Sequence, residues 1–312
     1  MTQPTNTYAT NDMIGIREDL SDVIYDISPV EVPFLSMVPH NEATNTLHEW
    51  QTDSLAAAAE NAAIEGDEAP DDASSPTTRL TNYTQISTKD ATISGTARAV
   101  NTAGRADEMD YQMLKRGREL KRDMETSLLA NTAKAAGDDS NARYLAGVPT
   151  WIATNTNADG ADPAGTGADT ATDGTQRAFT EAQLKEVLRE AFDAGGMPDT
   201  LMVGPYNRQE FSEFRPNTGF QKAEDQILHA TFEVYESDFG SLRVVPNRFQ
   251  RARDAYALQS DMWAVSFLTG RNMISFDLAK VGDVDQRQIL SEYTLECRNE
   301  AANGAIRDLT TS

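Results

Sequence analysis

The strongest periodic pattern in the chain is helical and lies between residues 106 and 136. Its apolar side chains recur about every three and a half positions, at Met109, Met113, Leu120, Met124 and Leu128. Acidic residues stand at its start, where a helix dipole favours negative charge, and Gly137 follows its end. The pattern predicts one helix of roughly 45 Å, far longer than the average helix of a globular domain.

Two segments before this helix have the composition of β-strands. Residues 47–55 and 79–93 are rich in Thr, Tyr, Ile and Trp, as strands prefer. The chain between them holds six acidic residues, no basic residue, and Ile64 as its one large apolar side chain. Such a segment cannot form its own core. We therefore expect a long hairpin that is either disordered or lies on a partner.

The region after the long helix predicts a mixed unit of helices and strands. A second helix opens with a capping box at Thr180 and Gln183, and a third starts at Pro205 and runs to about Phe214. The apolar set of the second helix is Leu184, Val187, Leu188, Ala191 and Phe192. Strands are expected at 200–203, 232–236, 241–245, 256–258, 262–268 and 288–298. The fold class is α+β.

Two polar segments flank these elements. Residues 1–46 form a polar arm with a short apolar centre, and three prolines between 29 and 39 favour an extended chain. We expect the arm to pack on its own domain or on another subunit. Residues 154–176 are nearly all Asn, Asp, Gly, Thr and Ala, which is typical of a surface loop or a flexible insert.

Charge and cysteine content narrow the function classes. Asp and Glu outnumber Lys and Arg by 49 to 27, giving a net charge of -22. This disfavours binding of nucleic acid by counterion release. The excess of negative charge suits a protein whose surface faces packed DNA without adhering to it, or a protein that works in salty water, or a protein that is simply soluble. The single Cys297 allows no internal disulfide and is expected in a strand. No apolar run approaches the roughly 20 residues that span a membrane, and no secretory signal is indicated.

The sequence lacks the usual marks of catalysis. His40, His48 and His229 are far apart, and there is neither a phosphate-binding Gly-Lys-Ser/Thr loop nor a Gly-x-Ser-x-Gly motif. The tripeptide at 238–240 spells the metal-binding motif of protein kinases, but its partner motifs are absent, so we interpret it as a turn. Acidic spacings in 159–174 lack the EF-hand pattern and allow only incidental ion binding. No cofactor, metal site or catalytic residue is expected.

Four stretches carry a resemblance to a known family. They are NDMIGIREDLSDVIYDISPVEVPFLSM (11–37), NTLHEWQTDSLAAAAENAAIEGDEA (45–69), YESDFGSLRVVPNRF (235–249) and RQILSEYTLECRNEAANGAIRDL (287–309). The chain resembles the major capsid proteins of tailed phages with the Hong Kong 97 fold, and more closely the podovirus-type major head proteins. The resemblance implies an N-terminal arm in 1–46, an extended E-loop in 47–96, a P-domain with a spine helix in 97–146, an A-domain in 147–270, and a strand returning to the P-domain in 271–312.

The resemblance also implies a function and partners. The chain would assemble into hexamers and pentamers of an icosahedral head that encloses double-stranded DNA without sequence-specific binding, in the host cytoplasm. A separate scaffolding protein and a portal protein would be partners, and a decoration protein is a further possible one. Covalent cross-linking through lysine is not expected, because residues 51–78 contain no lysine. The side chains expected to contact other subunits are Ile24, Tyr25, Phe34, Trp50, Leu55, Ile64, Tyr83 and Ile86.

Two alternatives stay open at this point. A cellular nanocompartment shell would share the same fold but enclose enzymes in place of a genome. A soluble acidic enzyme, with a site built from scattered carboxylates, would belong to another class. Particle size and DNA content would distinguish a nanocompartment shell from a phage head. A monomeric protein whose melting temperature shifts when a ligand binds would favour the enzyme.

Overall fold

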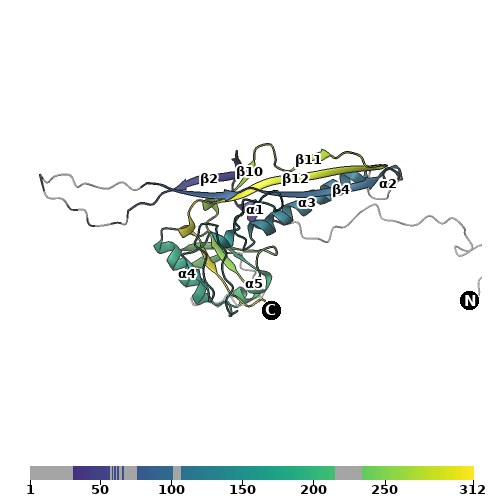
Figure 1. Cartoon of the computed structure of the whole chain (residues 1–312). Coiled ribbons are helices and arrows are strands. Elements are labelled where there is room, and N and C mark those ends of the chain that lie inside the picture. The colour runs from purple at the N-terminus through teal and green to yellow at the C-terminus, as the bar shows by residue number, and fades with distance from the viewer. Residues whose placement is uncertain are drawn as a thin grey trace, which may run out of the picture.

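The computed structural model describes residues 31–56, 58, 60, 62, 65–66, 76–100, 107–214 and 234–312. These residues form a long, narrow layer of sheet and helix with a compact second unit below it (Figure 1). The mixed α+β class expected from the sequence is confirmed.

The long layer is a five-stranded sheet organised around β12 (Val284–Cys297). One edge of β12 pairs antiparallel with β4 (Gln85–Ser94) over ten residue pairs. Its other edge pairs with β10 (Trp263–Leu268) and then with β11 (Ile274–Asp277), and β1 (His40–Ala43) adds to β10 in parallel. The strands predicted at 262–268 and 288–298 are therefore confirmed, and the structure shows that they are neighbours in one sheet.

The helix α3 (Glu108–Leu128) covers one face of this sheet (Figure 1). Side chains of β4 alternate across the strand, so Ala91 and Ile93 face the helix and pack with Met109. The helix starts at Asp107, whose carboxylate accepts a hydrogen bond from the Met109 N–H at 2.8 Å. Short helices α1 (Pro33–Met37) and α2 (Gly95–Ala99) lie against it.

The long helix ends eight residues before the expected 136. Residues 130–136 carry no large apolar side chain, so nothing extends the buried stripe beyond Leu129. The chain turns instead, and Ala135 and Tyr144 exchange both backbone hydrogen bonds, at 2.9 and 3.1 Å. Gly137 takes a left-handed conformation, φ +69°, inside that turn. It serves the turn and does not cap the helix.

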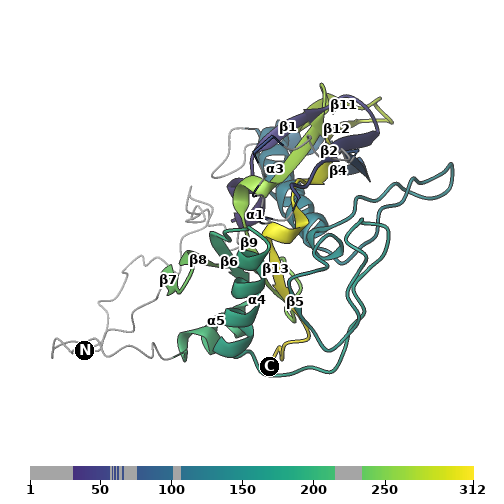
Figure 2. The same ribbon diagram turned by 90° about the vertical axis from the view of Figure 1, so that its left-hand side faces the viewer.

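The second unit is a six-stranded sheet in the order β5-β13-β9-β6-β8-β7. Its strands are β5 (Thr156–Asn157), β13 (Gly304–Ile306), β9 (Ala255–Leu258), β6 (Thr200–Val203), β8 (Gly240–Pro246) and β7 (Val234–Ser237). Helices α4 (Glu181–Asp193) and α5 (Pro205–Ser212) belong to the same unit (Figure 2). The capping box of Thr180 and Gln183 is present as predicted. Four of the five predicted apolar residues of α4 are buried, and Phe192 is half exposed.

Four strands cross the boundaries drawn from the resemblance. Two of them, β1 and β4, lie in the long sheet although 1–46 and 47–96 were assigned to the arm and the E-loop. The strand β10 lies in the long sheet although 147–270 was assigned to the compact unit, and β13 lies in the compact sheet although 271–312 was assigned to the long layer. The chain passes between the units more often than a single boundary allows. A shared core joins them, in which Trp151, Tyr256, Trp263 and Tyr293 are fully buried. Three 3-10 turns, at Val148–Thr150, Ser260–Met262 and Glu300–Ala302, link these elements.

Candidate functional site

A projecting hairpin is the most distinctive feature of the described surface. It consists of β2 (Leu47–Thr52) and β3 (Thr78–Tyr83), which pair only with each other. The end of the hairpin at Thr52 and Thr78 points away from both sheets (Figure 1). Just past it, the Leu55 side chain is 98% exposed. The predicted long return strand 79–93 divides at Thr84 into β3 and β4, which belong to different sheets.

Two side chains of this hairpin fix its base to the body of the subunit. The Trp50 indole N–H donates to the Cys297 carbonyl at 2.7 Å, and its ring packs on Trp151 with centroids 5.4 Å apart. Asn82 is fully buried, and its amide donates to the Leu295 carbonyl at 2.8 Å. Because base and body are joined by buried polar contacts, the hairpin is held at a defined angle.

Lys134 completes this junction from the other side. Its ammonium donates to the Thr81 carbonyl at 2.8 Å and to the Thr166 carbonyl at 2.9 Å, and it lies 5.8 Å from the centre of the Trp151 ring. Partial burial lowers the pKa of Lys134. The lysine links the hairpin to the 154–176 loop, a role that its sequence context did not signal.

The predicted contact residues fall into three groups. Leu55 and Ile86 are exposed, at 98% and 45%, and are available to another chain. Trp50 and Tyr83 are partly buried in their own subunit. Phe34 is fully buried against Trp263 and therefore offers no surface to a second copy. The remaining three, Ile24, Tyr25 and Ile64, lie outside the described residues.

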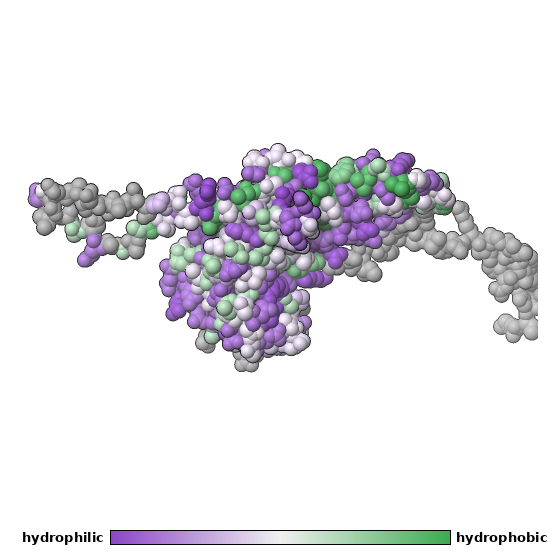
Figure 3. Space-filling model, viewed as in Figure 1, coloured by the Kyte–Doolittle hydropathy of each residue, from purple (hydrophilic) through white to green (hydrophobic). Residues whose placement is uncertain are grey.

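Exposed apolar residues also line the long sheet on the side away from α3. The cross-strand register places Ile86 on that side together with Phe276, which is 40% exposed, and Ile274. Figure 3 shows hydrophobic residues along this layer, whereas the compact unit is mostly polar. Ile86 was among the contact residues predicted from the sequence, whereas the β11 residues were not, because their exposure depends on the partner strand.

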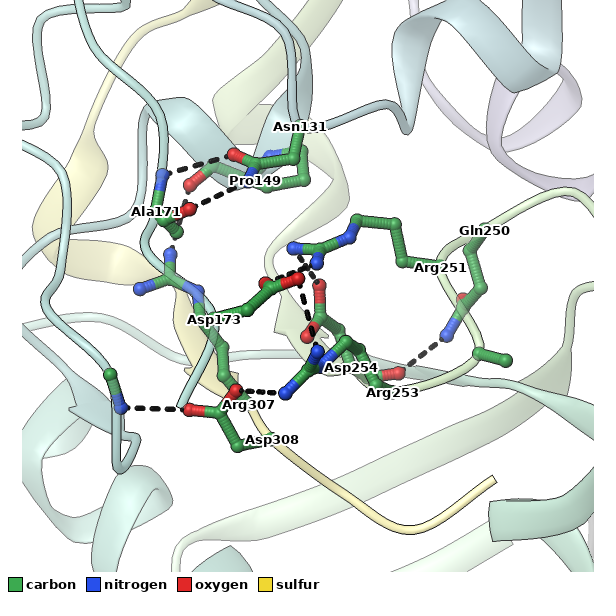
Figure 4. A network of polar contacts seen from close by, with 12 residues as sticks. Asn131, Pro149, Ala171, Asp173, Gln250, Arg251, Arg253, Asp254, Arg307 and Asp308 are labelled. Atoms are coloured by element: carbon green, nitrogen blue, oxygen red, sulfur yellow. Dashed lines mark hydrogen bonds and ion pairs between the residues drawn. The ribbon is translucent and has the colours of Figure 1, made fainter. Parts of the chain in front are cut away.

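The acidic loop at 154–176 is held by arginines. The Asp308 carboxylate accepts backbone N–H bonds from Asp159, Gly160 and Gly174, at 3.0, 2.9 and 2.8 Å. Arg253 joins this group by ion pairs to Asp308 and to Asp173, at 2.8 and 3.0 Å (Figure 4). The hydrogen bonds that hold its carboxylate lower the pKa of Asp308 against the effect of burial. Of the two interpretations left open, the ordered surface loop is the one seen.

No catalytic constellation is found in the part of the chain that the structure describes. There is no cluster of three or more potential metal ligands among those residues. His40 contacts the Leu35 carbonyl at 2.9 Å, and His48 contacts Glu296 at 3.4 Å. Cys297 is buried at the end of β12, and burial raises the pKa of its thiol. Residues 238–240 form the β7–β8 turn, as expected. No helix among the described residues is long and apolar enough to cross a membrane.

Comparison with known proteins places this architecture in a family. The family model for the SU10 major capsid protein matches residues 2–310. The chain belongs to the SU10 major capsid protein family. The major capsid protein of Escherichia phage Phieco32 is 28% identical over 349 residues, covering 98% of this chain and 97% of that protein. The chain is thus a major capsid protein, a structural component of the virion shell and not an enzyme.

Solved phage capsids share the fold of this SU10-family chain. A capsid asymmetric unit of cyanophage A-1(L) matches with a TM-score of 0.63 at 14% identity, covering 97% of this chain and 98% of that one. A structure of the major capsid and decoration proteins of phage G matches with a TM-score of 0.55 at 13% identity, over 99% and 100% of the two chains. At such low identity these matches establish the fold alone.

Proposed function

We propose that this capsid protein assembles into the hexamers and pentamers of an icosahedral head that encloses double-stranded DNA, in the manner of podovirus-type head proteins. The observation that supports this most is the β2–β3 hairpin. Its base is fixed by Trp50 and Asn82, while its end at Thr52 and Thr78 points away from both sheets. A rigid projection without a core of its own is suited to lie across a neighbouring copy.

The proposed division of labour follows the elements. Residues 47–96 act as the E-loop, α3 as the spine helix of a P-domain, and the six-stranded sheet as an A-domain around the centre of each capsomer. The structure supports three adjustments to the boundaries: β4 and β10 go with the P-domain, and β13 goes with the A-domain. Within the arm at residues 1–46, α1 and β1 pack on their own subunit, and the N-terminal end of the arm reaches along another copy.

The contact between copies would use the exposed apolar residues. The hairpin of one copy, with Leu55 just beyond it, would cover the open face of the long sheet of the next, where Ile86 and Phe276 are exposed. Burying a fully exposed side chain such as Leu55 stabilises a contact by roughly 1.5–3 kcal/mol, and Ile86 and Phe276, at 45% and 40% exposure, contribute less than half as much each. Each interface contributes a moderate free energy, but symmetric repetition over a closed shell multiplies the number of such interfaces. A separate scaffolding protein, a portal and a decoration protein are the further partners we propose.

Electron microscopy of the expressed full-length chain tests this proposal. We expect closed shells built from six-fold and five-fold capsomers, large enough to hold a phage genome. Particles too small for a genome and filled with protein would favour a nanocompartment instead. A chain that stays monomeric at all concentrations, with or without scaffolding protein, would refute the assembly model.

A further inference from the structure

The exposed face of α3 carries a basic stripe, made of Leu114, Lys115, Arg118 and Lys121. All four side chains are exposed, and Leu114 is 58% exposed. Such a concentration is unusual in a chain whose net charge is -22. Between residues 115 and 122 the helix has five basic residues and one acidic residue. This face of α3 therefore carries a local positive charge in an otherwise acidic protein.

Three acidic side chains of α3 pair with basic residues other than Lys115 and Lys121. Glu119 pairs with Arg116 at 2.6 Å, Asp123 pairs with Lys89 at 2.7 Å, and Asp110 pairs with Arg287 at 3.2 Å. Among the described residues, no carboxylate lies within 4.0 Å of Lys115 or Lys121. The described part of the subunit thus leaves these two ammonium groups available to an acidic partner.

The end of this helix face is already covered by the N-terminal part of the same chain. Glu125 follows Lys121 by four residues, Arg118 by seven and Leu114 by eleven, so it lies on the same face of α3. It is fully buried, because its carboxylate accepts the Phe34 and Leu35 N–H groups of α1, each at 2.8 Å. The segment that leads into α1 therefore arrives at the end of the basic stripe.

The sequence of that leading segment complements the stripe. Residues 18–31 contain five acidic side chains and no basic one. Its apolar residues Leu20, Val23, Ile24 and Ile27 recur at spacings of three and four, with acids between them. An acidic segment with one apolar side matches a basic stripe that also exposes a leucine.

We propose that the basic stripe of α3 is the binding surface for residues 18–31 of the same chain. The stripe begins about 6 Å from Glu125 along the helix axis and extends to about 16 Å. Thirteen residues of preceding chain reach up to about 43 Å, so the distance is easily spanned. A short tether raises the effective concentration of the segment to the order of millimolar. Packaged DNA has no such tether, and the net negative charge of the subunit repels it.

This inference goes beyond the proposed function, because it concerns how the arm folds onto its own subunit. Residues 1–17 remain available to reach another copy. In effect, only the distal part of the arm would serve contacts between copies. Residues 18–31 would neutralise the positive charge of the spine helix α3. They would also set the direction in which residues 1–17 leave the subunit.

Distance measurements between spin labels on the full-length chain test the proposal. Nitroxides are attached at Ser21→Cys and Thr126→Cys, and Cys297 does not interfere because it is fully buried. Doubly labelled protein is diluted into an excess of unlabelled protein, so that only pairs within one chain are measured. We expect a single narrow distance population. A broad distribution, or a narrow one that disappears on dilution, would overturn the assignment to the same chain.

Charge reversal then identifies the binding surface. Lys115→Glu/Lys121→Glu should broaden the distance distribution, and adding Asp22→Lys/Asp26→Lys should restore it. Lys185→Glu/Arg243→Glu makes the same change in net charge at exposed residues of the compact unit and should leave the distribution narrow. If the stripe variant keeps the narrow population, the arm binds elsewhere and the proposal is wrong. If duplex DNA at micromolar concentration displaces the label in the parent chain, the stripe is a DNA site instead. Neither result depends on whether shells form.

Discussion

Replacing Glu125 with alanine is expected to lower the free energy of unfolding of the unassembled subunit by about 3–5 kcal/mol. The carboxylate is fully buried where α3, α1 and the end of β8 meet. Besides the two α1 N–H groups, it accepts the Asn247 side-chain amide at 2.6 Å. Burial raises the pKa of Glu125, and these three donors oppose that rise.

The magnitude follows from what the substitution leaves behind. The Phe34 and Leu35 N–H groups belong to the first turn of α1, where no carbonyl of the helix itself can accept them. Each buried donor without a partner costs about 1–3 kcal/mol. Removing the buried charge offsets part of that sum. Glu125→Gln keeps one carbonyl acceptor but directs an NH2 group at a donor, so we expect a smaller loss of about 1–3 kcal/mol.

Urea denaturation at neutral pH, followed by tryptophan fluorescence, measures these losses. Glu119→Gln is the matched control, because Glu119 lies in the same helix but pairs with Arg116 near the surface. That change should cost at most about 1 kcal/mol. If Glu125→Ala were no more destabilising than the control, Glu125 would not join the three elements as we describe.

Further predictions concern the other buried contacts and use the same assay. Asp308 accepts hydrogen bonds from three backbone N–H groups and has φ +61°. Asp308→Ala removes this acceptor and should lower the free energy of unfolding by about 3 kcal/mol or more. Asp308→Asn should lower it less, because Asn tolerates that backbone conformation. Burial disfavours the ionised form of Glu296, but hydrogen bonds from His48 and Arg298 outweigh it and lower its pKa to about 2. The stabilisation of the folded subunit by ionised Glu296 is therefore present above pH 4.5 and lost as the pH falls from 4.5 towards 2. Glu296→Gln should lower the free energy of unfolding by about 1–2 kcal/mol at pH 7. It should also weaken the dependence of the free energy of unfolding on pH between 4.5 and 2. Trp50→Phe loses the bond to the Cys297 carbonyl and should cost about 1 kcal/mol without changing the core; an unchanged urea midpoint would show that this bond does not anchor the hairpin.

Periodicity and turn chemistry predicted most elements of the fold, and pairing between distant segments accounts for what they missed. The capping box at Thr180 and the β7–β8 turn are local features, so the sequence alone located them. The end of the long helix was placed too late, because Gly137 looks like a helix stop until its partner strand segment at Tyr144 is known. The place of β10 in the long sheet depends on β12, some thirty residues later in the chain.

Contacts between copies stay a prediction for Leu55 and Ile86, which are exposed in the structure. Phe34 was expected to contact another subunit, but it packs against Trp263 of its own. Such burial depends on contacts more than two hundred residues apart. Arg253, which holds the 154–176 loop, lies 79 residues after Gly174 in the chain, so the composition of the loop alone could not distinguish an ordered loop from a flexible insert.

The most direct test of the assembly model is electron microscopy of a chain in which residues 57–75 are replaced by a short glycine-serine turn. We expect that β2 and β3 still pair and that the subunit unfolds at the same urea concentration as the parent chain, yet no closed shells form. Shells of normal diameter and capsomer arrangement from this variant would show that the projecting hairpin is not what joins one subunit to the next.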